Sequence, residues 1–110
     1  MTFSVRTSDP AEIEIEANFQ HLFLKNADRA FDWLTGLRAA IASLDFMPRR
    51  CPQIRAKAYF GTEVRQLIYR DHRILFAFTE DEEGEAEQVV VLRVLHTAQR
   101  PLDEVDEEDD

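Results

Sequence analysis

The chain has 110 residues, of which 45% are hydrophobic and 10% aromatic. This size and composition are typical of one globular domain rather than of a disordered chain. Its single cysteine, Cys51, excludes an internal disulfide, so the fold needs no oxidising compartment. No apolar run is long enough for a signal peptide or a membrane span, and we therefore expect a cytoplasmic protein that does not enter a membrane.

The net charge of −9 is unevenly distributed. Seven of the last eight residues, 103–110, are acidic, and the remainder of the chain carries 15 acids and 13 bases. Between Arg49 and Arg73 the balance reverses, with seven bases against two acids. We expect a folded domain over residues 1–102 and a disordered acidic tail over residues 103–110.

The first expected elements are a short strand and a helix. Residues 2–7 alternate apolar and polar side chains, which predicts a half-buried strand. Asp9 is the expected N-cap of the helix, with Pro10 at the first helical position and Glu12 completing a capping box. The helix should end near Leu24, and its predicted buried stripe consists of Ile15, Phe19, Leu22 and Phe23.

A second helix is expected from an Asn26 cap to about Leu44, because apolar residues recur at steps of three and four. Gly36 is tolerated inside this helix at a cost of about 1 kcal/mol relative to Ala, and we expect it to allow close helix packing. The short break between the two helices predicts an antiparallel helical hairpin.

Residues 45–63 show no periodicity and are expected to form a long loop. Three strands follow, Val64–Arg70, His72–Thr79 and Gln88–His96, for which antiparallel pairing between neighbours is the simplest arrangement. The predicted fold is α+β, in the order β-α-α-β-β-β, with the helical hairpin packed on one face of a small antiparallel sheet. The expected core of this sheet includes Phe76, Phe78, Val90, Leu92 and Val94. Nothing in the pattern covers the opposite face.

The segments YRDHRILFAFTEDEE and QVVVLRVLHTAQRPL, together with MPRRCP and EVRQLIYR upstream, resemble the RelE/ParE superfamily of toxins from type II toxin–antitoxin (plasmid stabilisation) systems. The resemblance implies a toxin that a cognate antitoxin neutralises. RelE-like members cut mRNA in the ribosome with basic residues and often a C-terminal Tyr or His, whereas ParE-like members poison DNA gyrase without catalytic residues. The fold alone therefore does not identify the target.

Ribonuclease chemistry without a metal needs cations to hold the phosphorane and an acid and a base to move protons. Arg73 and Arg65 are the candidate phosphate ligands, His96 is the candidate acid or base, and Glu63 is a further possible base. Of these candidate site residues, Arg73 is the one that the family resemblance supports best. The alternative is structural, with Arg73 and Arg93 paired to carboxylates and His96 packed at a strand end. Strand alternation also places Arg93 and His96 on opposite faces.

Seven further cations are candidates for binding the antitoxin or a nucleic acid, and their alternative is a solvated surface: Arg49, Arg50, Arg55, Lys57, Arg70, Arg93 and Arg100. Basic neighbours are expected to lower the thiol pKa of Cys51, which nevertheless has no partner base for catalysis. No cofactor and no metal are expected.

The acidic C-terminal segment and the lack of a tyrosine there depart from the mRNA-cleaving branch. A growth-inhibiting toxin that binds DNA gyrase is therefore the preferred function. The alternatives are a ribosome-dependent mRNA endonuclease and a non-toxic member that only binds an antitoxin.

Overall fold

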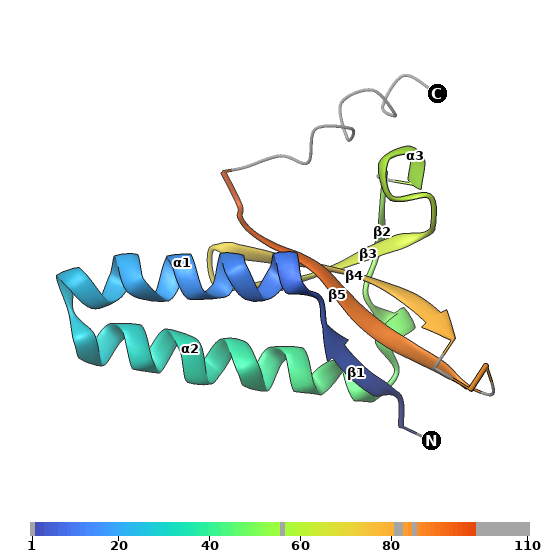
Figure 1. Cartoon of the computed structure of the whole chain (residues 1–110), viewed down its shortest axis with the longest axis horizontal. Helices are drawn as coiled ribbons and strands as arrows, with labels where there is room; N and C mark the ends of the chain where they lie inside the picture. Colours follow the sequence, from blue (N-terminus) through green and yellow to red (C-terminus); the bar gives the residue numbers. More distant parts are fainter. Residues whose placement is uncertain (1, 56, 81–82, 85, 99–110) are drawn as a thin grey trace.

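The computed structural model describes residues 2–55, 57–80, 83–84 and 86–98, so the predicted acidic tail and Arg100 lie outside the described residues. A helical hairpin forms one layer and a five-stranded sheet the other (Figure 1). The elements are β1 (Ser4–Thr7), α1 (Asp9–Lys25), α2 (Ala27–Ala42), two short 3₁₀ helices (Ser43–Asp45 and Pro48–Arg50), β2 (Gln53–Ile54), α3 (Lys57–Phe60), β3 (Val64–Tyr69), β4 (His72–Glu80) and β5 (Glu87–His96). No helix within these ranges is long and apolar enough to cross a membrane.

The predicted class and the helical hairpin on one face are confirmed, but the sheet is mixed rather than antiparallel. Its strand order is β1-β5-β4-β3-β2. Strands β2 to β5 pair antiparallel with their neighbours, while β1 runs parallel to β5, with Val5 opposite Val89. The helical hairpin follows β1 in the chain and precedes the other strands, so it forms part of the crossover connection that a parallel strand pair requires. The expected loop over residues 45–63 contains β2, α3 and a 3₁₀ helix.

Ser8 joins the start of α1 to the sheet, and the prediction of Asp9 as the N-cap is wrong by one residue. The Ser8 hydroxyl accepts a hydrogen bond from the Ala11 N–H (3.3 Å) and donates one to the Leu92 carbonyl (3.1 Å). Glu12 does not complete a capping box; its carboxylate instead binds Arg38 of α2 through two hydrogen bonds of 3.0 and 2.9 Å. Ser8 thus caps α1 and also links its first turn to β5.

A β-bulge in β5 decides which side chains reach the helices. Leu75 lies opposite Arg93 and Phe76 opposite Val91, so Leu92 is the extra residue. Before the bulge Val89 and Val91 face the helices, and after it Val94 does. Of the expected core residues of β5, Val90 and Val94 are buried, whereas Leu92 is half-buried and packs on the opposite face, since strict alternation fails at the bulge.

The main core lies between the hairpin and the sheet and includes Ile15, Leu37, Ile74 and Phe76. The opposite face of the sheet is not bare, contrary to expectation. Val64, Leu75 and Leu95 form a second buried cluster there, against which Ile54 and Phe60 pack. The β2–α3 segment therefore covers part of this face.

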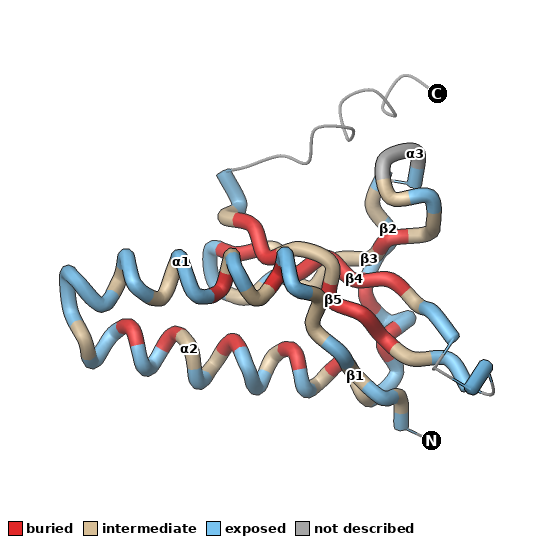
Figure 2. The backbone as a smooth tube through the Cα atoms, viewed as in Figure 1, coloured by how far each residue is buried: buried red, intermediate tan, exposed pale blue. Residues whose placement is uncertain are grey.

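The two helices contribute unequally to the core (Figure 2). Four residues of α2 are buried along its length, whereas the buried residues of α1, Ala11 and Ile15, lie in its first half. Gly36 of α2 lets the ring of Tyr69 approach, because a Cβ there would lie 2.0 Å from the Tyr69 hydroxyl. That hydroxyl donates to the Trp33 carbonyl (3.2 Å). The hairpin is thus held close to β3 by α2, while the second half of α1 is left to line a cleft.

Candidate functional site

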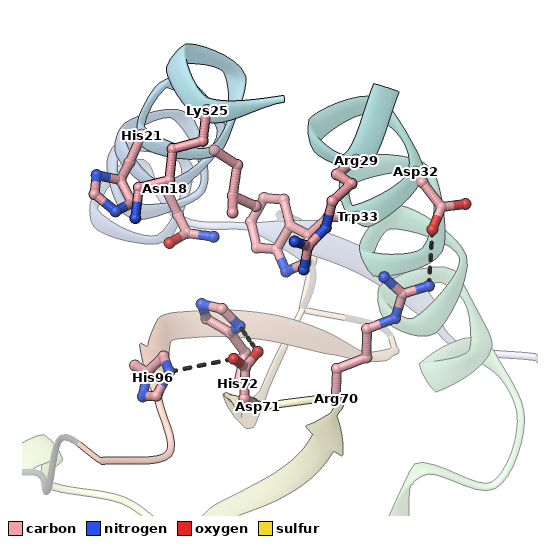
Figure 3. A pocket seen from close by; sticks show the side chains of 11 residues that line it. Asn18, His21, Lys25, Arg29, Asp32, Trp33, Arg70, Asp71, His72 and His96 are labelled. Atoms are coloured by element: carbon pink, nitrogen blue, oxygen red, sulfur yellow. Dashed lines mark hydrogen bonds and ion pairs between the residues drawn. The ribbon is translucent and has the colours of Figure 1, made fainter. Parts of the chain in front are cut away.

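A polar cleft of about 560 Å³ opens between the second half of α1, the first half of α2 and the β3–β4 turn. Asn18 and His21 approach from α1, Arg29 and Trp33 from α2, and Asp71 and His72 from the turn opposite (Figure 3). The remaining lining residues are Leu22, Lys25, Asp32, Arg70 and His96. The cleft continues the helix–sheet interface beyond the point where the apolar core ends.

Asp71 holds two histidines at the floor of this cleft. Its Oδ1 lies 3.0 Å from Nδ1 of His72, and its Oδ2 lies 3.3 Å from Nε2 of His96. The two imidazole rings meet edge to face, with centroids 5.3 Å apart. Nδ1 of His96 accepts a hydrogen bond from the Ala98 N–H (3.0 Å), so Nε2 carries the proton that His96 directs at Asp71.

His72 is held as a neutral imidazole. Burial lowers its pKa below the ordinary value for histidine, and this effect outweighs the opposing attraction of Asp71, while His96 lowers the pKa further. Because the Asp71 carboxylate only accepts hydrogen bonds, it selects the tautomer with the proton on Nδ1. The second ring nitrogen of His72 then faces the helices (Figure 3).

The pKa of Asp71 responds to the same group of side chains. Burial alone would raise it, but the backbone N–H of Asp71, the hydrogen bond from His72 and the attraction of both imidazoles in the acidic range where Asp71 titrates together bring it below the ordinary value. Asp71 is therefore ionised at neutral pH and fixes both rings. This arrangement makes the floor of the cleft a fixed polar surface.

Two buried donors in the cleft have no hydrogen-bond acceptor among the described residues. They are Nε1 of Trp33 and Nδ2 of Asn18. The Trp33 side chain is almost completely buried (4% exposed), and its ring packs against His72 with centroids 5.2 Å apart. Both donors point into the space above His72 (Figure 3). Native structures rarely leave such donors unpaired, because each costs about 1–3 kcal/mol.

The walls of the cleft carry an excess of positive charge. Arg70 is paired with Asp32 through a 3.1 Å hydrogen bond, and Asp71 is engaged by the two histidines. Lys25 and Arg29 line the cleft as well, and neither side chain forms an ion pair within the described part of the chain. The balance favours an anionic ligand.

The structure does not bring the three candidate catalytic residues together. Arg73 lies on the sheet face away from the helical hairpin, where its Nε donates to the Gln66 side chain (2.9 Å). The Arg65 side chain, 17% exposed, donates to the Glu63 carboxylate and to the carbonyls of Arg49 and Cys51. His96 lies in the cleft on the helix side, at the opposite end of the sheet from Arg65. Arg65 and Glu63 thus act together to hold the loop before β3.

The candidate partner-binding cations are also dispersed. Arg49 binds Glu87 at the other end of β5 and stacks over the Phe78 ring at 3.9 Å, while Arg50 donates to Ser43. Arg55 and Lys57 are exposed near α3. These residues and Arg70, at the cleft, occupy three separate regions of the surface.

Arg93 of β5 links this strand to α1 through Glu14. The Glu14 carboxylate accepts hydrogen bonds from Nε (2.9 Å) and Nη2 of Arg93 and from the backbone N–H of Val94 (2.8 Å). This carboxylate closes the edge of β5 beyond the point where β1 stops. Arg93 does not line the cleft that contains His96, in agreement with their predicted separation.

The thiol of Cys51 behaves opposite to expectation. Burial raises its pKa above the ordinary value, and the nearby Arg50 and Arg65 only partly offset this. Its side chain belongs to the main core. Cys51 is therefore a packing residue in this structure.

The sequence interpretation did not single out Asn18, His21, Trp33, Asp71 or His72 as site residues. A signal for them existed on the first helix, where Asn18, His21 and Lys25 follow buried Ile15 at steps of three and four. Polar residues that continue an apolar stripe indicate a place where the core gives way to a cleft. Within the described ranges, no group of three or more His, Cys, Asp or Glu could hold a metal ion.

Comparison with known proteins decides the family. A family model described as "ParE toxin of type II toxin-antitoxin system, parDE" matches residues 5–101. The chain belongs to the ParE toxin family. The resemblance to the RelE/ParE superfamily is thereby confirmed.

The solved structures that match the fold of this chain include the "Chromosomal ParDE TA system from P. aeruginosa". The two are 15% identical with a TM-score of 0.66, and the match covers 86% of this chain and 96% of the other. A comparison with curated protein sequences gives no match. The family model thus shows the toxin family, and the solved structure shows the fold.

Proposed function

We propose that this ParE-family protein inhibits growth by binding DNA gyrase and that a cognate antitoxin neutralises it. The observation that carries the proposal is the match of the ParE toxin family to residues 5–101. The dispersal of Arg73, Arg65 and His96 supports it, because a toxin that acts by binding needs no catalytic group of residues. We expect the chain to act in the cytoplasm, where gyrase works.

The test is induction of the chain without its antitoxin, followed by two readouts. A gyrase poison traps cleaved DNA on the enzyme and induces the SOS response, whereas an mRNA endonuclease stops translation first. The purified protein is then added to gyrase in a supercoiling assay, with and without antitoxin. Arrest of translation before any DNA damage would contradict the gyrase target.

One observation favours the mRNA endonuclease as a second candidate. Asp71 fixes the tautomer of His72, and a histidine oriented in this way is suited to act as a general base. Arg29 and Arg70 line the same cleft and could attract a phosphate. Cleavage of ribosome-bound mRNA that is lost in His72→Gln would establish this candidate. Normal growth under full induction would support the third possibility, a non-toxic antitoxin-binding member.

Arg73→Ala is expected to reduce toxicity while the protein stays folded. Arg73 lies half-buried on the face away from the helices, and its replacement removes a positive charge there together with a hydrogen bond to Gln66. The stability cost is expected to be about 1 kcal/mol. The matched control is Arg38→Ala, which removes an arginine from the outer surface of the helical hairpin. Equal toxicity of the two variants at matched expression would remove Arg73 from the target-binding surface.

A further inference from the structure

Another pocket, of about 440 Å³, lies at the end of the sheet where β4 ends and β5 begins. Arg49 marks this place, because its guanidinium lies over the Phe78 ring of β4 and binds Glu87 of β5. The cleft with its two histidines lies at the opposite end of the same two strands, so the two hollows are separate. The residues that line the pocket are Phe3, Met47, Pro48, Arg49 and Arg50.

Two large apolar side chains are exposed at this pocket. Met47, which lines it, is 60% exposed, and Phe46, its neighbour in the chain, is 59% exposed. Exposed apolar side chains that adjoin one another are typical of protein interaction surfaces. A side chain of a partner can therefore reach Met47 without any change in the fold.

The backbone of Met47 lies in the left-handed region, at φ 46° and ψ 54°. Glycine favours this region because a Cβ causes strain there, and within the described ranges Arg70 is the one other non-glycine residue with a positive φ. The turn is fixed by the Phe3 N–H, which donates to the Asp45 carbonyl (2.7 Å), and by the Arg50 N–H, which donates to the Met47 carbonyl (3.0 Å). Strained backbone of this kind clusters at binding and active sites.

Two arginines give the rim of the pocket a positive charge. Arg49 binds the Glu87 carboxylate at 3.1 Å. Among the residues that the structure describes, the Arg50 guanidinium contacts neutral groups, the Ser43 hydroxyl (3.4 Å) and the Cys51 thiol (3.6 Å). The described lining residues include no acid. Arg50 can therefore bind a carboxylate that a partner places beside an apolar side chain.

The same features argue against other occupants. A second copy of the chain, related by a two-fold axis, would bring Arg49 and Arg50 of both copies together, which charge repulsion disfavours. A nucleic acid would bring phosphates to the arginines but no apolar side chain to Met47. The gyrase-binding surface is proposed on the sheet face that carries Arg73, whereas Phe3 and Phe78 pack on the main core and place the pocket on the helix side. A polypeptide other than gyrase, apolar and acidic, matches all three features.

We propose that this pocket binds the cognate antitoxin, through a large apolar side chain that packs against Met47 and a nearby acidic side chain that pairs with Arg50. The inference rests on the proposed function, which supplies the antitoxin as a partner. A pocket of about 440 Å³ lies within the usual range for binding sites, about 300–1,000 Å³. Side chains that fill well-packed pockets carry most of the binding energy at protein interfaces.

Met47 supplies the readout, because Met1 is the one other methionine of the chain. The full chain is isotope-labelled at its methionine methyl groups and titrated with purified antitoxin, the product of the reading frame beside the toxin gene. The Met47 methyl signal is expected to shift in NMR spectra, and calorimetry of the same titration gives Kd. The measurement does not depend on growth inhibition. A chain that binds the antitoxin but not gyrase would contradict the proposed target and leave this inference standing.

One variant tests the apolar contact. Met47→Gly removes the side chain at a backbone position that glycine favours, so the melting temperature is expected not to fall. Kd is expected to rise at least about tenfold. The matched control is Leu24→Ala, which shortens an apolar side chain that is 87% exposed at the far end of α1. It is expected to leave Kd unchanged.

A second variant tests the charge. Arg50→Gln is expected to raise Kd about threefold, because an exposed ion pair contributes modestly to binding. Its control is Arg38→Gln on the outer surface of the helical hairpin, for which no change in Kd is expected. Antitoxin variants with single acids replaced by amides complete a double-mutant cycle. The acid that pairs with Arg50 is the one whose loss, combined with Arg50→Gln, weakens binding less than the two separate losses multiplied together.

Three outcomes would overturn the proposal. An unchanged Kd in Met47→Gly or in Arg50→Gln would contradict the proposed contacts while leaving neutralisation by the antitoxin intact. A Met47 signal that moves with protein concentration alone, together with a dimer in sedimentation, would assign the pocket to a second copy. A shift caused by an oligonucleotide or by gyrase, with none caused by the antitoxin, would assign the pocket to a nucleic acid or to the target.

Discussion

The two halves of the helix–sheet interface are built from the same helices and strands but differ in chemistry. In the half nearer β1, Ile15 and Leu37 pack on Ile74 and Phe76 and form the apolar core. In the other half, Asn18 of α1 takes the position one turn beyond Ile15 and faces a cleft. The contrast shows where close apolar packing of the interface ends and a cleft lined by polar side chains begins.

Truncation of a leucine in each half should show the largest difference. Leu37→Ala, in the fully buried half, is expected to lower the free energy of unfolding by about 2–5 kcal/mol. Leu22→Ala removes the same atoms from a half-buried wall of the cleft and is expected to cost less than about 1.5 kcal/mol. Urea denaturation followed by Trp33 fluorescence measures both. Equal costs would mean that the cleft is packed as tightly as the core.

Glu14 stands at the boundary between the two halves, and its loss should have the next largest effect. Glu14→Ala removes the carboxylate that accepts from the Val94 N–H and from Nε and Nη2 of Arg93, at an expected cost of about 2–3 kcal/mol. Glu16→Ala is the control, because Glu16 is exposed on the same helix and, among the residues that the structure describes, its side chain binds only Gln20. Its expected cost is within about 0.5 kcal/mol. A similar loss in both variants would contradict the role of Glu14 at the edge of β5.

The free energy of unfolding should also depend on pH through His72 in the cleft half, with an effect smaller than that of the substitutions above. The pKa of His72 is lowered in the native state, so below about pH 6.5 the unfolded chain takes up a proton that the native chain does not. The free energy of unfolding is therefore expected to fall as the pH decreases through this value, by at most about 1.4 kcal/mol per pH unit for one proton. The groups around His72 are Asp71, His96, Trp33 and, across the cleft, His21.

Unfolding of wild type and His72→Gln between pH 5 and 7.5 isolates this contribution. The variant is expected to show a flatter dependence, because it lacks the imidazole that takes up this proton on unfolding. Asp71, whose pKa is lowered, adds its own loss only in the acidic range near and below about pH 4. Parallel curves for the two proteins would show that His72 is not held neutral.

The local features of the sequence predicted most of the fold. The apolar period of α2 and the three strand-like runs fixed those elements to within a residue or two, because their patterns are local. Leu92 was predicted to be a core residue, but a β-bulge there changes which side chains of β5 point towards the helices. No local sequence pattern indicated the bulge. Gly36 was predicted to allow close helix packing, but the neighbour that it admits is the ring of Tyr69 in the sheet.

The site residues were predicted less well, for a physical reason. Arg65, Arg73 and His96 were grouped by the chemistry they could share, but the pleat and strand order distribute them over two faces and two ends of the sheet. Asn18, Trp33 and His72 were not grouped, because they lie on three elements far apart in the chain. Their common position depends on how the hairpin is placed over the β3–β4 turn.

The sequence by itself determined the family, the helical hairpin and the antiparallel order of the last three strands, because these depend on local periodicity and on motifs contiguous in the chain. Only the tertiary structure decided the parallel pairing of β1, the edge contact of Glu14 and the cleft with its unpaired donors. Each of these joins residues more than a dozen positions apart, and such contacts arise from the packing of layers rather than from any local preference.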